Sequence, residues 1–253
     1  MNSRRKFIIA FLTLCFAVLF ITSRVNPKTV RVQQHLTYNT DVKDTSLSID
    51  QETFSSHLPV VSIDTGGAVI PGRPERGQRV EQIKNSFIHS NVKIWEKEGE
   101  LNTLHQKADL EVQADIRVRG NSSRRFNKVG YLLKFVDSDG NDNDKVVMGM
   151  ESSSSWILHG PFLDKTLMRN YMWYNLSGQI MEWAPDVRFC EVFLNGSYQG
   201  VYVMTEQISV GDGRIDIKKY DGKSEITSYV VCADRTSVND VFYLNNSNFA
   251  HRY

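Results

Sequence analysis

The chain has 253 residues, with 30 basic and 29 acidic side chains and a formal net charge of +1. This balance provides no overall attraction to nucleic acid or to anionic membranes, so an anion site on this chain must be local. Hydrophobic residues make up 41% and aromatic residues 11% of the chain. That composition is typical of globular proteins and excludes the disordered and fibrous classes.

The N-terminus has the layout of an export signal. A basic cluster, Arg4 to Lys6, precedes an apolar run over residues 7–22. As a helix this run would span about 24 Å at ~1.5 Å per residue, which is less than the ~30 Å hydrocarbon core of a bilayer. We therefore expect a signal peptide or short signal anchor over residues 1–23. The rest of the chain is then extracytoplasmic, either secreted or held at the membrane by this segment.

Residues 24–57 are rich in Thr, Ser, Asp and Gln and show no hydrophobic period, which predicts a polar linker. The globular part is expected to begin near residue 58 and to extend to residue 253. Its first predicted strands are residues 58–65 and 87–95, separated by a loop rich in Gly and Pro.

Two predicted strands flank a basic loop over residues 119–128. Apolar and charged residues alternate over 110–119, and the alternation resumes with Tyr131 and Phe135, which leaves Lys134 on the opposite face. The loop carries several cations and the hydrogen-bonding side chains Asn121, Ser122 and Ser123. Two interpretations stay open: a polar hairpin turn, or an anion site built from backbone N–H groups and cationic side chains.

Residues 137–144 place Asp and Asn at spacings 1, 3 and 5, as in a calcium loop. However, glycine occupies position 4 rather than 6, and Met148 stands where a calcium loop has glutamate. A solvated acidic turn is therefore expected. The sequence predicts no metal site.

A helix is predicted from Asp164, as N-cap, to about Trp183, with Pro185 ending it. Arg169 near its start is disfavoured by the helix dipole and should have a partner, either Asp164 or an anion. An apolar stripe at helical spacing is interpreted as core packing. The stripe consists of Met168, Tyr171, Met172, Leu176 and Ile180.

The clearest local signal is Asn195-Gly196 between alternating strands over 187–194 and 197–204. This dipeptide is typical of a type I′ hairpin turn. In all, about eight strands and one helix are predicted, which indicates an α+β fold with an antiparallel sheet and a helix packed on one side. Cys190 and Cys232 lack metal-site spacing, and both a disulfide and two free thiols stay open.

The motifs of serine hydrolases, zincins and P-loop enzymes do not occur in the sequence. Four stretches, in this order and spacing, resemble the CotH kinase family, the spore coat protein H type of atypical protein kinase. They are Arg119-Gly-Asn-Ser-Ser with Lys128 and Lys134; Met148-Gly-Met before Trp156-Ile-Leu-His159; Asp164-Lys-Thr-Leu-Met-Arg-Asn; and Glu191-Val-Phe-Leu-Asn-Gly with Tyr198-Gln-Gly-Val-Tyr-Val-Met-Thr-Glu206.

This resemblance implies the N-terminal lobe of a divergent protein-kinase-like fold. It implies ATP with Mg or Mn as cofactor and transfer of phosphate to Ser or Thr of secreted, surface or coat proteins. By the same resemblance the phosphate-side loop is Arg119, Gly120, Asn121, Ser122 and Ser123. The nucleotide-contacting lysine is Lys134 or, as second choice, Lys128, and Glu206 is expected near the adenine.

The family's metal-binding and catalytic aspartates lie downstream of the stretches that this chain matches, so its catalytic residues are unknown at this point. The expectation is a kinase domain without its acidic half. Two further interpretations stay open. One is a non-catalytic binding or structural module of the same fold, and the other is a carbohydrate-binding or adhesin-type β-domain.

Overall fold

The computed structural model describes residues 4, 9, 11–17, 51–79, 83, 85–211, 213–217 and 223. The chain divides into two compact units, Met1–Val32 and Gln33–Tyr253. In the first unit, residues 11–17 are helical, and the Thr13 hydroxyl donates to the Ile9 carbonyl at 2.8 Å. No helix in the described part of the chain is both long and apolar enough to cross a membrane. Most of the predicted signal segment and linker lie outside the described residues.

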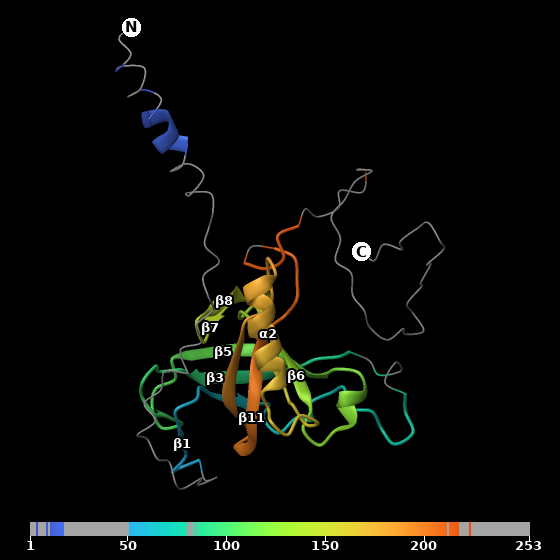
Figure 1. The fold of residues 1–253 in the computed structure, drawn as a ribbon. Coiled ribbons are helices and arrows are strands. Elements are labelled where there is room, and N and C mark those ends of the chain that lie inside the picture. Colours follow the sequence, from blue (N-terminus) through green and yellow to red (C-terminus); the bar gives the residue numbers. More distant parts are fainter. Residues whose placement is uncertain are drawn as a thin grey trace. The chain divides into compact units, whose positions relative to one another are not determined.

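The second unit is built around strands, most of which Figure 1 labels. They are β1 (Ser55–Ser56), β2 (Val60–Asp64), β3 (Ile88–Trp95), β4 (Asn102–Thr103), β5 (Leu110–Arg119), β6 (Gly130–Val136), β7 (Lys145–Val147), β8 (Met150–Ser153), β9 (Ser155–His159), β10 (Val187–Leu194) and β11 (Ser197–Glu206). A 3₁₀ turn covers Ser122–Arg125, and the helix α2 covers Arg169–Ile180. The predicted α+β class is confirmed.

The main sheet closes into a barrel with the strand order β10-β11-β9-β6-β5-β3-β2. Closure comes from β10 and β2, which pair in parallel, whereas the other neighbours pair antiparallel. The expected antiparallel sheet is therefore corrected at one junction. Closure leaves the barrel without an exposed strand edge. The pairs β1–β4 and β7–β8 form two small separate sheets.

The barrel core follows from the alternation along its strands. In β5, Val112, Ala114, Ile116 and Val118 are buried, and the residues between them point away from the core, as predicted. Packing begins before the predicted boundary at residue 58, because Phe54 is buried and its ring meets Phe193 edge-on, with centroids 4.9 Å apart.

The predicted hairpin is confirmed. Asn195 and Gly196 have φ angles of +46° and +80°, as a type I′ turn requires of both central residues, and they connect β10 to β11. The Asn195 side chain also accepts a hydrogen bond from Thr65 N at 2.8 Å. This bond ties the turn to the residue that follows β2.

Helix α2 lies beside β11 in Figure 1 and packs through Tyr171, whose ring stacks on Phe189 of β10 with centroids 4.4 Å apart. It begins at Arg169 rather than just after Asp164. The Asp164 carboxylate nevertheless accepts a hydrogen bond from Arg169 N at 2.8 Å and pairs with the Arg169 side chain at 3.6 Å. Asp164 is therefore the partner of Arg169. The prediction that the apolar stripe is core is wrong for the described residues, since only Tyr171 of that stripe is buried.

Candidate functional site

The basic loop between β5 and β6 begins with a glycine-dependent turn. Gly120 has a φ of +112°, and a Cβ at this position would lie 2.1 Å from the Ser123 hydroxyl. A side chain would therefore clash, and Gly120 lets the chain enter the 3₁₀ turn Ser122–Arg125. Asn121 and Ser122 are exposed. Within the described residues their side chains, and that of Ser123, form no hydrogen bond, so their polar groups are available to a ligand.

Arg124 is a structural cation of this loop. It is buried, and its Nε donates to the Gly120 carbonyl at 2.6 Å. Its two terminal nitrogens donate to the Gly72 carbonyl at 3.3 Å and to Asn85 Oδ1 at 3.0 Å. Arg124 thereby joins the loop to the segment between β2 and β3. The contacts with Gly72 and Asn85 join residues about forty to fifty positions apart in the sequence. The pattern of neighbouring residues could therefore not reveal them.

The other basic residues nearby hold the same two segments together. Arg73 donates to the Asn127 carbonyl at 2.9 Å, and Arg125 donates to the Gln78 carbonyl at 2.6 Å. Gly72 itself lies against β5, because a Cβ there would be 2.8 Å from the Val118 carbonyl oxygen. The polar hairpin turn is therefore an anchored loop rather than a free one.

Arg119, at the end of β5, differs from these anchoring cations. It pairs with Gly130 in the sheet, and its Cγ would lie 3.8 Å from a Cβ on that glycine. Burial lowers its pKa, and Tyr174 of α2 acts in the opposite direction. In the described part of the chain the guanidinium has no hydrogen bond and no ion pair. An arginine with its donors unused is the group that most needs an anionic partner.

Arg117 lies two residues earlier on the same strand face. Its Nη1 donates to Asn85 Oδ1 at 3.3 Å and to the Val118 carbonyl at 3.4 Å. Its Nε is enclosed and has no partner among the described residues. The guanidinium also lies 5.3 Å from the Phe87 ring centroid. Burial lowers the pKa of Arg117, and the charges of Arg124 and Arg119 lower it further.

Arg117, Arg119 and Arg124 form what we call the arginine cluster. Like charges oppose one another here, since Arg119 also depresses the pKa of Arg124 after burial. In the described part of the chain none of the three pairs with a carboxylate. Other described cations do, for example Lys93 with Glu111, Lys134 with Asp142, Arg169 with Asp164, and Arg214 with Glu206. A bound oxyanion would relieve the repulsion and use the free donors.

His159, at the end of β9, adjoins the arginine cluster. Burial lowers its pKa, the positive charge of Arg119 lowers it further, and Asp164 opposes the shift. The imidazole is therefore neutral at physiological pH and offers one N–H donor and one acceptor. Three of the four family-like stretches, represented by Arg119, His159 and Asp164, thus come together in space. Sequence reasoning did not select His159, Arg117 or Arg124.

Lys128 lies against two glycines of neighbouring segments, Gly160 and Gly200. Its Nζ lies 4.5 Å from the centroid of Tyr202, a residue of the main core. Burial lowers the pKa of Lys128, while the nearby Glu191 and Cys190 raise it. Cys190 is a buried free thiol, and Cys232 lies outside the described residues. The cation–π contact with Tyr202 is a structural reason for a lysine at position 128.

Lys134 does not join the arginine cluster. Its Nζ pairs with Asp142 Oδ1 at 2.7 Å on the surface, and in the sheet it stands opposite Asp115 and Ser155. It lies four residues beyond Gly130, about 13 Å along the strand at ~3.3 Å per residue. This pair places Lys134 outside the arginine cluster, and its role as the nucleotide-contacting lysine stays a prediction. Its partner belongs to the acidic turn, which Asp137 closes by accepting from Asn141 N at 2.8 Å.

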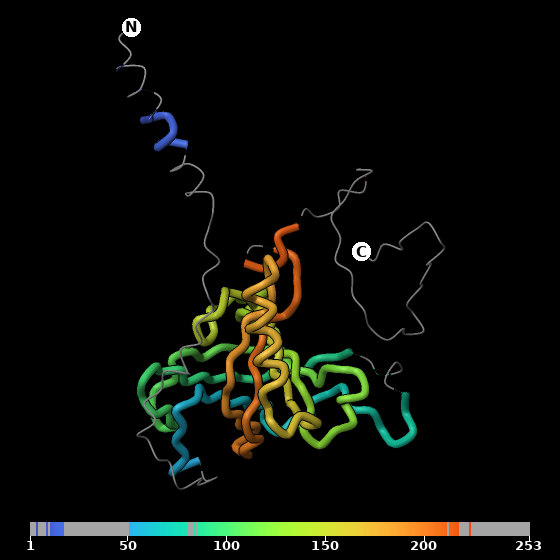
Figure 2. The backbone as a smooth tube through the Cα atoms, in the orientation of Figure 1, coloured from blue at the N-terminus to red at the C-terminus, as the bar shows by residue number. Residues whose placement is uncertain are grey.

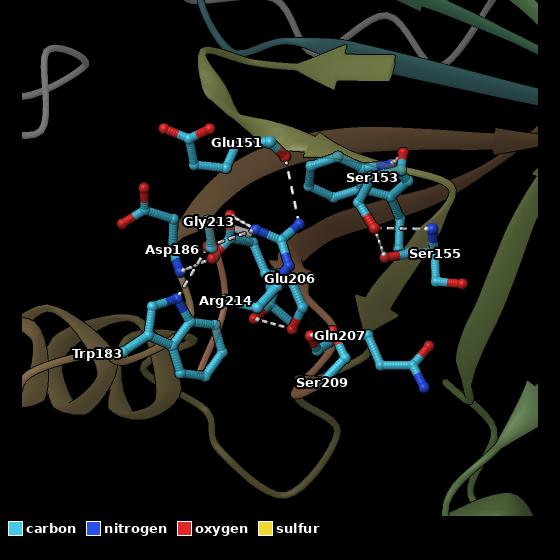
Figure 3. A network of polar contacts seen from close by, with 12 residues as sticks. Glu151, Ser153, Ser155, Trp183, Asp186, Glu206, Gln207, Ser209, Gly213 and Arg214 are labelled. Atoms are coloured by element: carbon cyan, nitrogen blue, oxygen red, sulfur yellow. Dashed lines mark hydrogen bonds and ion pairs between the residues drawn. The ribbon is translucent and has the colours of Figure 1, made fainter. Parts of the chain in front are cut away.

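Glu206 is buried at the end of β11 in a separate polar network (Figure 3). Its Oε1 pairs with Arg214 Nη1 at 2.7 Å, and its Oε2 accepts from Asp186 N at 2.9 Å. Arg214 Nη2 donates in turn to the Glu151 carbonyl at 3.2 Å. Both Glu206 carboxylate oxygens are therefore occupied by protein groups. These contacts give Glu206 a structural role, and its expected position near an adenine stays a prediction.

A family model described as CotH kinase protein matches residues 116–237. The predicted resemblance is confirmed. The CotH match includes Arg117, Arg119, Arg124 and His159, so the arginine cluster lies within the matched segment. No curated protein matches the chain.

Proposed function

We propose that this chain is an exported CotH-type protein kinase domain that takes phosphate from ATP and transfers it to Ser or Thr of surface or coat proteins. The observation that carries the proposal is the arginine cluster. It combines three neighbouring guanidiniums with no carboxylate partner in the described residues, and it lies within the CotH match. Export is supported by the basic and apolar N-terminal residues.

The arginines bind the nucleotide phosphates in this proposal. A guanidinium stays protonated at neutral pH even when burial depresses its pKa, so the arginine cluster retains its charge. Arg119 offers unused donors, whereas Arg117 and Arg124 already spend part of theirs on Asn85. Arg119 is therefore the principal phosphate ligand. Arg117 and Arg124 contribute positive electrostatic potential more than direct hydrogen bonds.

The loop and His159 complete the phosphate side. Asn121, Ser122 and Ser123 follow Arg119 and Gly120 and carry the unbonded polar groups described above. The neutral imidazole of His159 supplies a hydrogen bond without adding a further positive charge beside Arg119. It thus binds an oxyanion or a substrate hydroxyl without increasing the repulsion within the site.

Phosphoryl transfer in this family calls for a divalent metal, Mg or Mn, which neutralises charge on the phosphates. Within the described ranges no three His, Cys, Asp or Glu residues come together as a metal site. The described residues therefore do not fit a metal centre, and we assign none of them to the metal or to abstraction of the substrate proton. Their contribution is to bind and orient the phosphates.

The test is ATP binding, measured calorimetrically on the full chain with and without Mg²⁺ or Mn²⁺. Arg119→Ala should weaken binding, while Arg125→Ala, which removes a cation bonded to a backbone carbonyl, serves as the matched control. Equal affinity of wild type and Arg119→Ala would remove the phosphate-site assignment. Transfer of labelled phosphate to a Ser-containing protein then separates the kinase from a module that only binds nucleotide.

A further inference from the structure

Helix α2 carries an apolar face that no described part of the chain covers. Six large apolar side chains along and just beyond it are at least 43% exposed. They are Met168, Met172, Trp173, Leu176, Ile180 and Met181. By contrast, Tyr171 on the opposite side is buried against the barrel.

This exposure is unusual in its arrangement. Met168, Met172, Leu176 and Ile180 follow one another at intervals of four residues, so they form a continuous ridge. Single exposed apolar residues need no explanation, but a contiguous ridge on a short helix marks an interaction surface.

The chain itself is fastened beside the C-terminal end of this helix after it leaves β11. Trp183 Nε1 donates to the Gly213 carbonyl at 3.1 Å. The next residue, Arg214, is held by the buried pair with Glu206 (Figure 3). In Figure 2 the tube of residues 207–211 and 213–217 runs alongside the end of α2. Whatever follows Ile217 therefore starts within reach of the ridge.

The sequence after Ile217 contains an apolar run suited to this face. Within residues 218–237 the longest run without a charged side chain, 226–233, opens with Ile-Thr-Ser-Tyr-Val-Val-Cys. The CotH match extends to residue 237, so this run and α2 lie within the same matched segment. Nine Cα-to-Cα steps lead from Ile217 to Ile226 and span up to about 30 Å when extended. The helix is only about 18 Å long at ~1.5 Å per residue.

We propose that residues 226–232 pack on the apolar ridge of α2 and cover it within the same molecule. The proposal is independent of the nucleotide site. The apolar stripe of α2, which the sequence pattern assigns to the core, would then be covered. It would lie between the barrel and residues 226–232.

Cys232 provides a direct test in the full chain. With Cys15→Ser and Leu176→Cys in place, a short bismaleimide should join position 176 to Cys232 within one molecule. Peptide mapping identifies the link. The matched control is Val69→Cys, which is 87% exposed on a loop after β2. Tethering gives the correct pair an effective concentration on the order of millimolar, so the link should persist on dilution.

Each outcome decides the proposal. A dilution-resistant monomer link at position 176 but not at 69 supports it. Equal linking at both positions, or no link, overturns it, and links found only in dimers assign the ridge to a second copy instead. In a second measurement, Met172→Asp should speed amide exchange over residues 226–232 at least about tenfold, whereas Val69→Asp should leave it unchanged. Unchanged exchange in Met172→Asp contradicts the proposal even if both variants fold.

Discussion

Two regions of this protein bury arginine in opposite ways. At the end of β11, Arg214 is matched by Glu206, and every oxygen of that carboxylate has a partner. At the end of β5, Arg117, Arg119 and Arg124 stand together, and within the described residues they bond only to carbonyls and to Asn85. A buried charge is tolerated only when something compensates it. The first region is complete as it stands, and in our proposal a bound anion completes the second.

Loss of the Glu206 charge should produce the largest change. Glu206→Gln leaves Arg214 as an uncompensated charge, since the Arg214 and Glu206 side chains are only 5% and 2% exposed. We expect the free energy of unfolding to fall by about 3–5 kcal/mol. Denaturant unfolding of the full chain measures this, with Lys93→Gln at an exposed ion pair as control. A loss no larger than the control's contradicts the structural role.

Arg119→Gln should weaken ATP binding without lowering stability. It removes a repelling charge from the arginine cluster, so stability should stay the same or rise slightly. ATP affinity should fall about 10- to 100-fold, as expected for loss of charged hydrogen bonds worth roughly 1.5–3 kcal/mol. Calorimetry and thermal unfolding on the same samples give both quantities. A protein that is destabilised yet binds ATP normally would reverse our assignment of the two regions.

The titration of His159 should report the state of the arginine cluster. Its folded pKa is lowered first by burial and then by Arg119, below the ordinary 6.5. Protonation therefore favours the unfolded chain, and this contribution to stability is lost as pH falls from about 6.5 toward the folded pKa. Both Arg119→Gln and bound phosphate should raise the pKa of His159, which NMR of the imidazole measures. A pKa unchanged by either would show that Arg119 does not act on His159.

Lys134 should matter least. Its pair with Asp142 is exposed, and such pairs contribute about 0–1 kcal/mol. We expect Lys134→Ala to leave ATP affinity within twofold of wild type, or about 0.4 kcal/mol. A large loss of affinity would return Lys134 to the site and weaken the case for the arginine cluster.

Local features of the fold were predictable from the sequence because they depend on neighbours in the chain. The Asn195-Gly196 turn and the alternation of β5 each follow from short-range backbone rules. The barrel's parallel closure between β2 and β10 was not predictable, because about 130 residues separate the paired positions. The exposed ridge of α2 was misassigned for a related reason. Periodicity shows that a face is apolar but does not show what covers it.

The candidate site was predictable only in part. Pattern selected Arg119 and its loop, but it could not distinguish Arg119, which lacks a partner in the described residues, from Arg124 and Arg125, which hold backbone carbonyls. The alternation pattern favoured Lys134 as a nucleotide ligand because it lies on the opposite strand face from Tyr131 and Phe135. In the structure Lys134 forms an ion pair with Asp142. His159 had no motif of its own, and only its neighbours in space indicate a role.

The most direct test compares the arginine regions in one experiment. Guanidinium Nε–H signals of the full chain, assigned by single Arg→Lys variants, would be followed by NMR during titration with ADP. We predict saturable shifts for Arg117, Arg119 and Arg124, largest for Arg119, and no change for Arg214. Unchanged signals from the arginine cluster at millimolar ADP, or an equal response from Arg214, would contradict this prediction.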